Sequence, residues 1–295
     1  MIYLDKFELV NEEEDKHLIQ KIKNRYSRDE WFPIGFFAKK KLARIDFEKV
    51  TIFYGGNGSG KSTLLNLIAE KLNLRRHAEN APTGAFYDFA DLCKIKSKKI
   101  PPSSQILTSE DVFKNIFDTR TSNNAIAEKK AEYEEMFDYS SNDDMYDGFN
   151  NSELISKKLV KRSFVEKNTK IKQRQYSNGE NALKFFKSQI QNKSLFLLDE
   201  PENSMSPKYQ TELKKFLEAC ASYDDCQLII ATHSPFILSI ADAKVYSLDD
   251  IPVTVSKWYN LKNIKLYYDF FKKHGDLFEL DNVDTKTKLK PKSSK

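Results

Sequence analysis

Long apolar runs and cysteines are scarce in this sequence. No stretch approaches the roughly 20 consecutive apolar residues that a membrane-spanning helix needs, and a charged segment beginning at Asp5 and Lys6 rules against a secretory signal. Cys93, Cys220 and Cys226 lack the spacing of metal ligands. These absences favour a soluble, cytoplasmic protein without contact to the membrane, in which the thiols stay reduced.

A strong charge excess is also missing. The 295 residues include 48 Lys and Arg against 43 Asp and Glu, a net charge of +5, which permits an acidic partner such as nucleic acid without arguing for one. Three basic runs are candidate DNA surfaces, although most such runs are simply solvated: Lys39–Lys41, Lys96–Lys99 and Lys157–Lys172.

Apolar strands alternate with amphipathic helices at both ends of the chain. The strands are predicted at 2–10, 50–54, 195–198 and 227–231, with one or two more in 243–257. The helices are predicted at 62–72, 180–190, 207–221 and 260–274. This alternation predicts an α/β fold with a mostly parallel sheet covered by helices on both faces.

The middle of the chain is polar and rich in Lys and Glu. We expect residues 76–174 to form a mostly helical lobe, with helices at 125–137 and 153–167 and a loop at 138–151, inserted into one core of residues 1–75 and 175–280. Residues 11–30 are highly charged and are predicted as a surface excursion. The Lys-rich tail, 281–295, is predicted to be disordered.

A glycine-rich stretch between strand 50–54 and helix 62–72 carries the clearest motif. It fits G-x-x-x-x-G-K-[ST], a loop whose backbone amides wrap phosphates at a helix N-terminus. Lys61 would supply a charge to the β- and γ-phosphates, and Ser62 a hydroxyl to Mg²⁺. The predicted nucleotide-binding residues are Gly55, Gly56, Asn57, Gly58, Ser59, Gly60, Lys61, Ser62 and Thr63.

Two acids end the apolar strand 195–198. Because the carboxyl edge of a parallel sheet faces the ligand crevice, Asp199 and Glu200 are expected beside the phosphate loop. Asp199 suits Mg²⁺ coordination together with Ser62, and Glu200 suits a general base that polarises the attacking water.

Three further segments bring in a family resemblance. Tyr176-Ser177-Asn178-Gly179-Glu180 resembles the signature motif of ABC ATPases, Pro201–Pro207 stands where these proteins carry the D-loop, and Ala231–Pro235 resembles the loop of their switch histidine. The details are most similar to soluble AAA-type ABC ATPases, which are related to SMC and DNA-repair heads and to phage-defence ATPases. The resemblance implies ATP and Mg²⁺ as cofactors and a catalytic role for His233 beside Glu200 and Lys61.

The signature segment also has a physical interpretation. Ser177, Asn178, Gly179 and Glu180 open a helix and therefore form a second anion-binding N-terminus. One chain has its own phosphate loop, so the second anion site makes sense if it serves the nucleotide of another copy. That predicts a head-to-tail homodimer with two sandwiched ATP molecules. The family resemblance implies that such a dimer drives or gates a companion effector protein in DNA maintenance or phage defence.

Some assignments stay open at this stage. Gln105 is a candidate for the glutamine that touches Mg²⁺ in the family, and Trp31, Phe36 or Phe37 could stack on adenine or belong to the core. Two other functions remain alternatives: the energising subunit of a membrane transporter, and a non-hydrolysing ATP-dependent switch that controls a toxin or nuclease.

Overall fold

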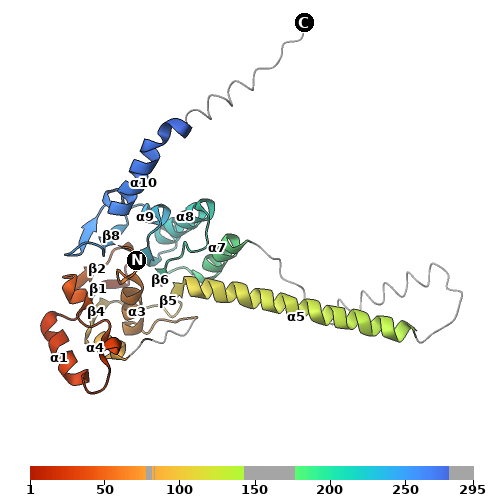
Figure 1. The fold of residues 1–295 in the computed structure, drawn as a ribbon, viewed down its shortest axis with the longest axis horizontal. Coiled ribbons are helices and arrows are strands. Elements are labelled where there is room, and N and C mark those ends of the chain that lie inside the picture. The colour runs from red at the N-terminus through yellow and green to blue at the C-terminus, as the bar shows by residue number, and fades with distance from the viewer. Residues whose placement is uncertain (78–81, 83, 143–176, 279–295) are drawn as a thin grey trace, which may run out of the picture. The chain divides into compact units, whose positions relative to one another are not determined.

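The computed structural model describes residues 1–77, 82, 84–142 and 177–278 (Figure 1). The helix predicted at 153–167, the tail 281–295 and most of the loop predicted at 138–151 lie outside these residues. The first residues of that loop, 138–142, are helical instead, because helix α5 (Ser109–Asn142) continues through them.

The larger sheet has the order β5-β6-β7-β3-β8-β9. Its first five strands are mutually parallel, and β9 adds an antiparallel edge. The mostly parallel sheet that the sequence predicts is thereby confirmed. The strands are β5 (Gln105–Thr108), β6 (Leu195–Asp199), β7 (Gln227–Thr232), β3 (Val50–Tyr54), β8 (Lys244–Ser247) and β9 (Thr254–Ser256).

The three central strands end at one edge of the sheet. All residues of β3 and β7 are buried, as expected for strands covered on both faces. The register sets Tyr54 beside Thr232 and Asp199 beside Ala231. The segments that follow β3, β6 and β7 therefore leave the sheet side by side at its carboxyl edge, where α/β proteins bind their ligands.

Helices cover this sheet. Helix α3 (Lys61–Lys71) packs against β5, β6 and β7, and α8 (Pro207–Tyr223) packs against β7. The buried residues of α3 include Leu64, Leu65, Leu67 and Ile68, the apolar side predicted from the sequence. After the short α9 (Pro235–Leu238), the chain ends its described part with η2 (Trp258–Asn260) and α10 (Lys262–Lys273).

A smaller antiparallel sheet has the order β2-β1-β4. It consists of β2 (Arg44–Asp46), β1 (Leu4–Glu8) and β4 (Lys94–Ser97), and with α4 (Ala85–Leu92) it contributes to the same core cluster as α3. Strands β4 and β5 and helix α4 all lie within the stretch expected to be a helical insertion. The two strands have four residues each and mixed polarity, so their pairing partners rather than their own pattern define them.

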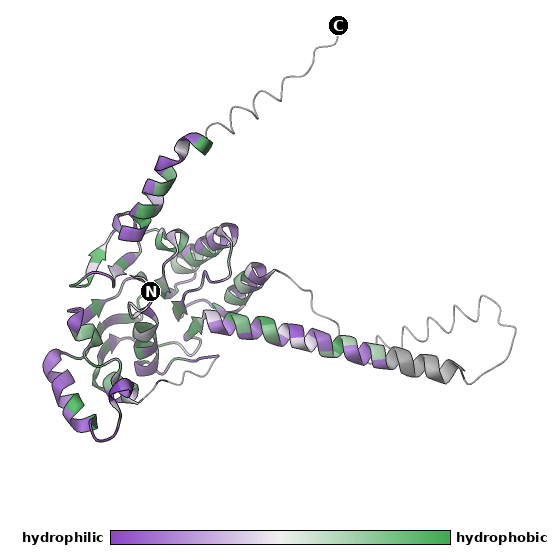
Figure 2. Ribbon diagram, in the orientation of Figure 1, coloured by the Kyte–Doolittle hydropathy of each residue, from purple (hydrophilic) through white to green (hydrophobic). Residues whose placement is uncertain are grey.

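Residues 11–30 are more ordered than the predicted surface excursion. Helix α1 (Glu12–Ile22) begins with a capping box in which Asn11 accepts from the amides of Glu13 and Glu14. Although the helix is mostly hydrophilic (Figure 2), Leu18 and Ile22 are buried. A 3₁₀ turn, η1 (Arg28–Trp31), and the short α2 (Phe36–Lys39) follow.

The contacts divide the chain into two compact units. One comprises residues 1–108 and 190–295, and the other comprises residues 109–189. The division thus falls at Ser109 and Gln189, whereas the insertion was expected at 76–174. Within the second unit, α5 packs against α7 (Asn178–Gln189). Of the helices in the described ranges, none combines the length and apolarity that a membrane crossing requires.

Candidate functional site

The phosphate loop connects β3 to α3 and is shaped by its glycines. Gly60 has a φ of 97°, and a Cβ placed there would stand 2.5 Å from Cε1 of Phe36. Gly58 has a φ of 75° but open space around it, whereas a Cβ on Gly55 would lie 2.4 Å from Oγ of Ser59. Gly55 and Gly60 are therefore required by close approach, and Gly58 and Gly60 by their left-handed backbone.

Lys61 is the buried charge of this loop. Its side chain is only 4% exposed, and its Nζ donates to the carbonyls of Gly55 at 2.8 Å and Gly56 at 3.1 Å. The same Nζ lies 3.4 Å from Oε1 of Glu200. A cavity of about 340 Å³ lies here, lined by residues 57–63 and Glu200. A concave loop with a lysine at the N-terminus of a helix fits the phosphates of a nucleotide.

Asp199 and Ser62 form the second part of the site. The Ser62 hydroxyl donates to Oδ1 of Asp199 over 3.0 Å. Burial raises the pKa of Asp199 to about 6, and the charge of Glu200 adds to this, while the bond from Ser62 and the charge of Lys61 oppose it. A cation at this point would remove the cost of the buried charge.

The donor set also fits Mg²⁺ rather than a metal with an all-protein cage. Among the described residues, no group of three or more His, Cys, Asp and Glu could hold a metal ion. Mg²⁺ is usually held by one or two protein oxygens together with substrate phosphates, and the paired oxygens of Ser62 and Asp199 provide that number.

Glu200 follows Asp199 in a backbone conformation that is uncommon for a residue with a side chain. Its φ is 46°, and its amide donates to the carbonyl of Ala231 over 2.9 Å. Asn203 Nδ2 donates to Oε2 over 3.1 Å, and His233 Nδ1 lies 3.7 Å from Oε1. Strained residues of this kind are held in place by their surroundings and are typical of active sites.

Glu202 is a site residue that the sequence analysis did not single out. It is 4% exposed, and its Oε1 accepts from the Thr232 hydroxyl and from the amides of His233 and Ser234 at 3.1 and 3.2 Å. Its Oε2 is buried and has no hydrogen-bond partner among the residues that the structure describes, and burial raises the pKa of Glu202. One carboxylate oxygen therefore fixes the loop that carries His233. The signal that could have indicated Glu202 is its position in the sequence, between Pro201 and Asn203 in an acid-rich segment.

Asp249 was missed as well. Both of its carboxylate oxygens accept from the amide of Gly56, at 3.0 and 3.1 Å. It lies shortly after β8, the neighbour of β3 on the side away from β7. Its position after a parallel strand was the signal that could have indicated it, because such positions lie at the ligand edge.

The signature segment lies in the second unit and opens α7. The amide of Glu180 donates to Oγ of Ser177 over 3.3 Å, a typical N-cap interaction. Arg120 of α5 donates to Oδ1 of Asn178 over 2.8 Å, and Lys184 pairs with Glu180 at 3.1 Å. Gly179 is buried within the helix. The segment is thus fixed on α7, and Arg120 brings a cation to it.

The remaining candidates concern the Mg²⁺-contacting glutamine and the adenine-stacking aromatic residue. Gln105 opens β5 opposite Phe196, while Thr108 is the register partner of Asp199. Three residues of strand, about 10 Å, therefore separate Gln105 from the carboxyl edge. Phe37 is fully buried in the core, whereas Phe36 lies against Gly60.

The phosphate loop after β3, the acids after β6 and the histidine after β7 give this chain an ABC-ATPase-like P-loop fold. Residues 95–239 match the model of the family described as "AAA domain, putative AbiEii toxin, Type IV TA system". This match confirms the resemblance to ABC-type AAA ATPases.

Some solved structures are also similar to this chain. The Smc head domain of Pyrococcus furiosus, solved with the C-terminal domain of ScpA, is 12% identical over 92% of this chain and 100% of that one, with a TM-score of 0.41. CbiO1 of Clostridium perfringens, part of an ABC transporter complex, is 17% identical over 80% and 90%, with a TM-score of 0.39. No curated protein gives a significant sequence match.

Proposed function

We propose that this protein binds and hydrolyses Mg-ATP in a head-to-tail homodimer, and that the cycle drives or gates a companion protein. The observation that supports it best is the convergence around Lys61. Glu200 lies 3.4 Å from Nζ of Lys61 and 3.7 Å from Nδ1 of His233, next to the Ser62–Asp199 pair.

Each side chain has a role that follows from its position. Lys61 exchanges its carbonyl partners for the β- and γ-phosphate oxygens, and the α3 N-terminus donates amides to them. Ser62 and Asp199 would hold Mg²⁺, which would supply charge neutralisation to these phosphates. Glu200 accepts a proton from the attacking water, and Asn203 and the backbone of Ala231 hold it in place. His233 donates to the γ-phosphate from the loop fixed by Glu202.

The signature segment supports the proposed homodimer. Ser177 to Glu180 form an anion-binding helix N-terminus with Arg120 beside it. A two-fold arrangement would let this end of each copy face the phosphate loop of the other, so that every site is completed in trans. The family description names a putative toxin of a type IV toxin–antitoxin system, which supports a defence role in a system of two components.

Replacement of Glu200 by Gln tests the hydrolytic site. The amide keeps the size of the side chain but cannot take the proton, so turnover should fall at least about 100-fold, while Mg-ATP should still bind and hold the dimer. Phosphate release and light scattering after gel filtration measure the two effects. Normal turnover in a monomeric variant would contradict the proposal. Background turnover in the unmodified protein would instead favour the non-hydrolysing switch.

A mixing experiment tests the composite site. The variants Lys61→Ala and Ser177→Arg should each be inactive, because one lacks the phosphate contact and the other lacks the signature. A mixture contains heterodimers in which one site unites an intact phosphate loop with an intact signature, so activity should reappear. If the mixture stays as inactive as its components, completion in trans is wrong.

A further inference from the structure

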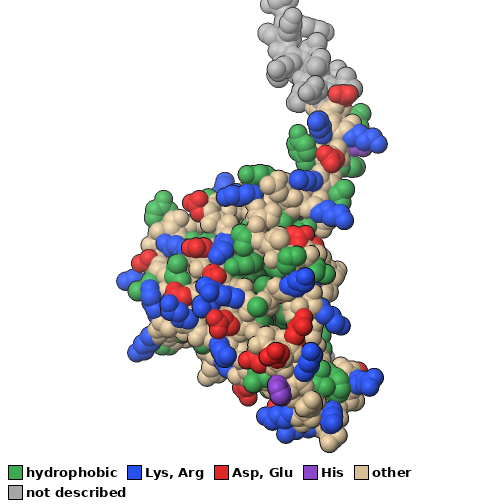
Figure 3. Space-filling model, turned by 90° about the vertical axis from the view of Figure 1, so that its left-hand side faces the viewer, with side chains coloured by type: hydrophobic (Ala, Val, Ile, Leu, Met, Phe, Trp, Pro, Cys, Tyr) green, Lys and Arg blue, Asp and Glu red, His purple; other side chains and the backbone are tan. Residues whose placement is uncertain are grey.

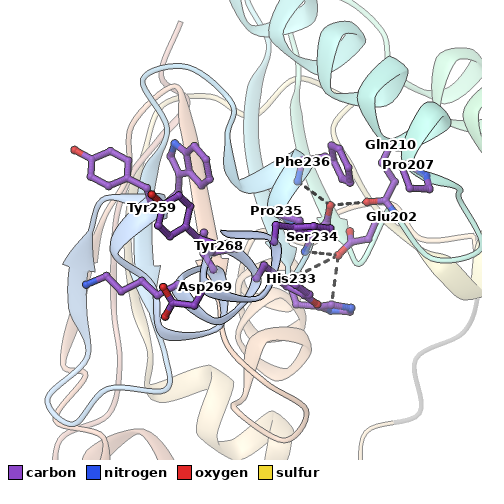
Figure 4. A pocket seen from close by; sticks show the side chains of 15 residues that line it. Glu202, Pro207, Gln210, His233, Ser234, Pro235, Phe236, Tyr259, Tyr268 and Asp269 are labelled. Carbon is purple, nitrogen blue, oxygen red and sulfur yellow. Dashed lines mark hydrogen bonds and ion pairs between the residues drawn. The ribbon is translucent and has the colours of Figure 1, made fainter. Parts of the chain in front are cut away.

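A groove lined mostly by aromatic and apolar side chains lies on the first unit, and we call it the aromatic groove. Its volume is about 960 Å³, and its walls come from η2 and α10 on one side and from α8 and the loop after β7 on the other. In Figure 4, Tyr259 and Tyr268 stand on one side of the groove, and Pro235 and Phe236 on the other.

Helix α10 presents far more apolar surface than it buries. Ile264 is the buried residue of this helix, and the amide of Asn263 donates to the hydroxyl of Tyr54 over 3.4 Å. Tyr267, Tyr268 and Phe271, by contrast, are 50%, 64% and 55% exposed. A monomeric protein rarely leaves such a patch without a binding role.

The same segment is basic. Residues 257–276 contain five lysines against the two acids Asp269 and Asp276, namely Lys257, Lys262, Lys265, Lys272 and Lys273. Lys265 lines the groove with the aromatic residues, and Nζ of Lys272 lies 5.9 Å from the ring centre of Tyr268. Figure 3 shows lysine and apolar side chains next to each other along this helix, below the grey tail.

The combination of aromatic rings and lysines at a concave groove distinguishes between possible ligands. Lysine is depleted at protein–protein interfaces, although aromatic residues are enriched there. A bilayer favours lysines with aromatics, but it offers a broad surface that lies over a helix and does not enter a concave groove. Single-stranded nucleic acid needs both features in a groove, because its bases stack on aromatic rings and its phosphates pair with lysines.

We propose that the aromatic groove binds single-stranded nucleic acid. Bases stack against Tyr259, Tyr267 and Tyr268, and Lys265 and Lys272 contact the phosphates. The acids that line the groove do not prevent this. Asp269 belongs to a segment with five lysines and two acids, of which Lys265 also lines the groove. Glu202 is buried, with Oε1 bonded to the loop after β7. The binding needs no ATP and therefore stands apart from the proposed hydrolysis.

Fluorescence polarisation of a labelled oligothymidylate of about 20 nucleotides, with the full chain and without nucleotide, tests the proposal. Tyr267→Ala and Lys265→Ala should each weaken binding about tenfold, since a stacked base or a phosphate contact is lost. Two matched controls should bind normally: Tyr223→Ala, an 87% exposed aromatic at the end of α8, and Lys39→Ala, from another basic run. Thermal melts show that each variant is folded.

The salt dependence and the tryptophan give independent readouts. With the two phosphate contacts of Lys265 and Lys272, affinity should fall about 7-fold between about 50 and 200 mM salt, and Lys265→Ala should reduce the slope. The chain has two tryptophans, so Trp31→Phe leaves Trp258, which lines the groove. Its fluorescence should be quenched on binding.

Three outcomes would overturn the proposal. One is the absence of binding at low salt. Another is a loss of binding in Lys39→Ala that exceeds the loss in the groove variants, which would move the site to another surface. The third is retention by anionic vesicles, or self-association in light scattering, that depends on Tyr267 while oligothymidylate binding does not.

Discussion

Asp199 should make the stability of the nucleotide-free protein depend on pH in an unusual direction. Burial raises its pKa from 3.8 to about 6 in the folded state. Between these values the folded protein holds a proton that the unfolded chain releases, so stability falls as pH rises through this window. The loss is complete above pH about 6. Roughly two units at 1.4 kcal/mol each give about 3 kcal/mol as an upper value.

The variant Asp199→Asn isolates this effect. An asparagine keeps the size of the side chain and can accept from Ser62, but it carries no charge to bury. Urea unfolding without Mg²⁺ should show the unmodified protein losing about 2 kcal/mol relative to the variant between pH about 4.5 and 7. Mg²⁺ added at neutral pH should restore part of this loss to the unmodified protein alone.

The direction in which the stability difference between the two proteins changes with pH tests this reasoning. If the stability difference between the two proteins stays constant with pH, Asp199 is not desolvated in the folded state. If the unmodified protein instead gains stability relative to the variant as pH rises, the carboxylate is stabilised as a charge, and the reasoning from burial is refuted.

Three further predictions concern the loops and thiols. Gly60→Ala should lower the free energy of unfolding by about 2–3 kcal/mol, because the new Cβ meets Phe36. Gly58→Ala, which places its Cβ in open space, should lower it by about 1 kcal/mol. Urea unfolding measures both values. Glu202→Ala should lower the free energy of unfolding by at least about 3 kcal/mol, because three buried donors lose their acceptor. Glu202→Gln should change stability little, since an acceptor oxygen remains. Ellman's reagent at pH about 8 should react slowly with the folded protein and fully in urea, because the thiols are buried: Cys93, Cys220 and Cys226.

The sequence predicted best those segments in which one kind of residue is required, apolar residues in the buried strands and glycines in the phosphate loop. Strand 50–54 and the strand before Asp199 are rich in apolar residues, and the loop after strand 50–54 is rich in glycine; both strands stand where their patterns predict. A buried strand in a parallel sheet needs an uninterrupted apolar run. Such a run ends where the sheet ends, so the site at its carboxyl edge could be predicted with it.

Strands and side chains whose roles depend on partners elsewhere in the chain could not be predicted from the local sequence. Strand β5 has four residues and an amide at its first position, and it is a strand because β6 pairs with it. Glu202 looked like one acid among several, and its role depends on three donors that lie 30 to 32 positions away in the chain. Local periodicity carries no information about such contacts.

The loop after β7 is a wall shared by the candidate ATP site and the aromatic groove. His233 faces Glu200 at 3.7 Å, and the next residue, Ser234, donates to Gln210 of α8 over 2.6 Å. Both backbone amides bond to the same oxygen of Glu202. A ligand in the groove can influence hydrolysis only through a contact that differs between two positions of this loop. Oε1 of Glu202 is the point at which such a difference would reach His233, so Glu202→Ala, which removes this acceptor from both amides, should weaken any effect of oligothymidylate on ATP turnover in protein that thermal melts show to be folded.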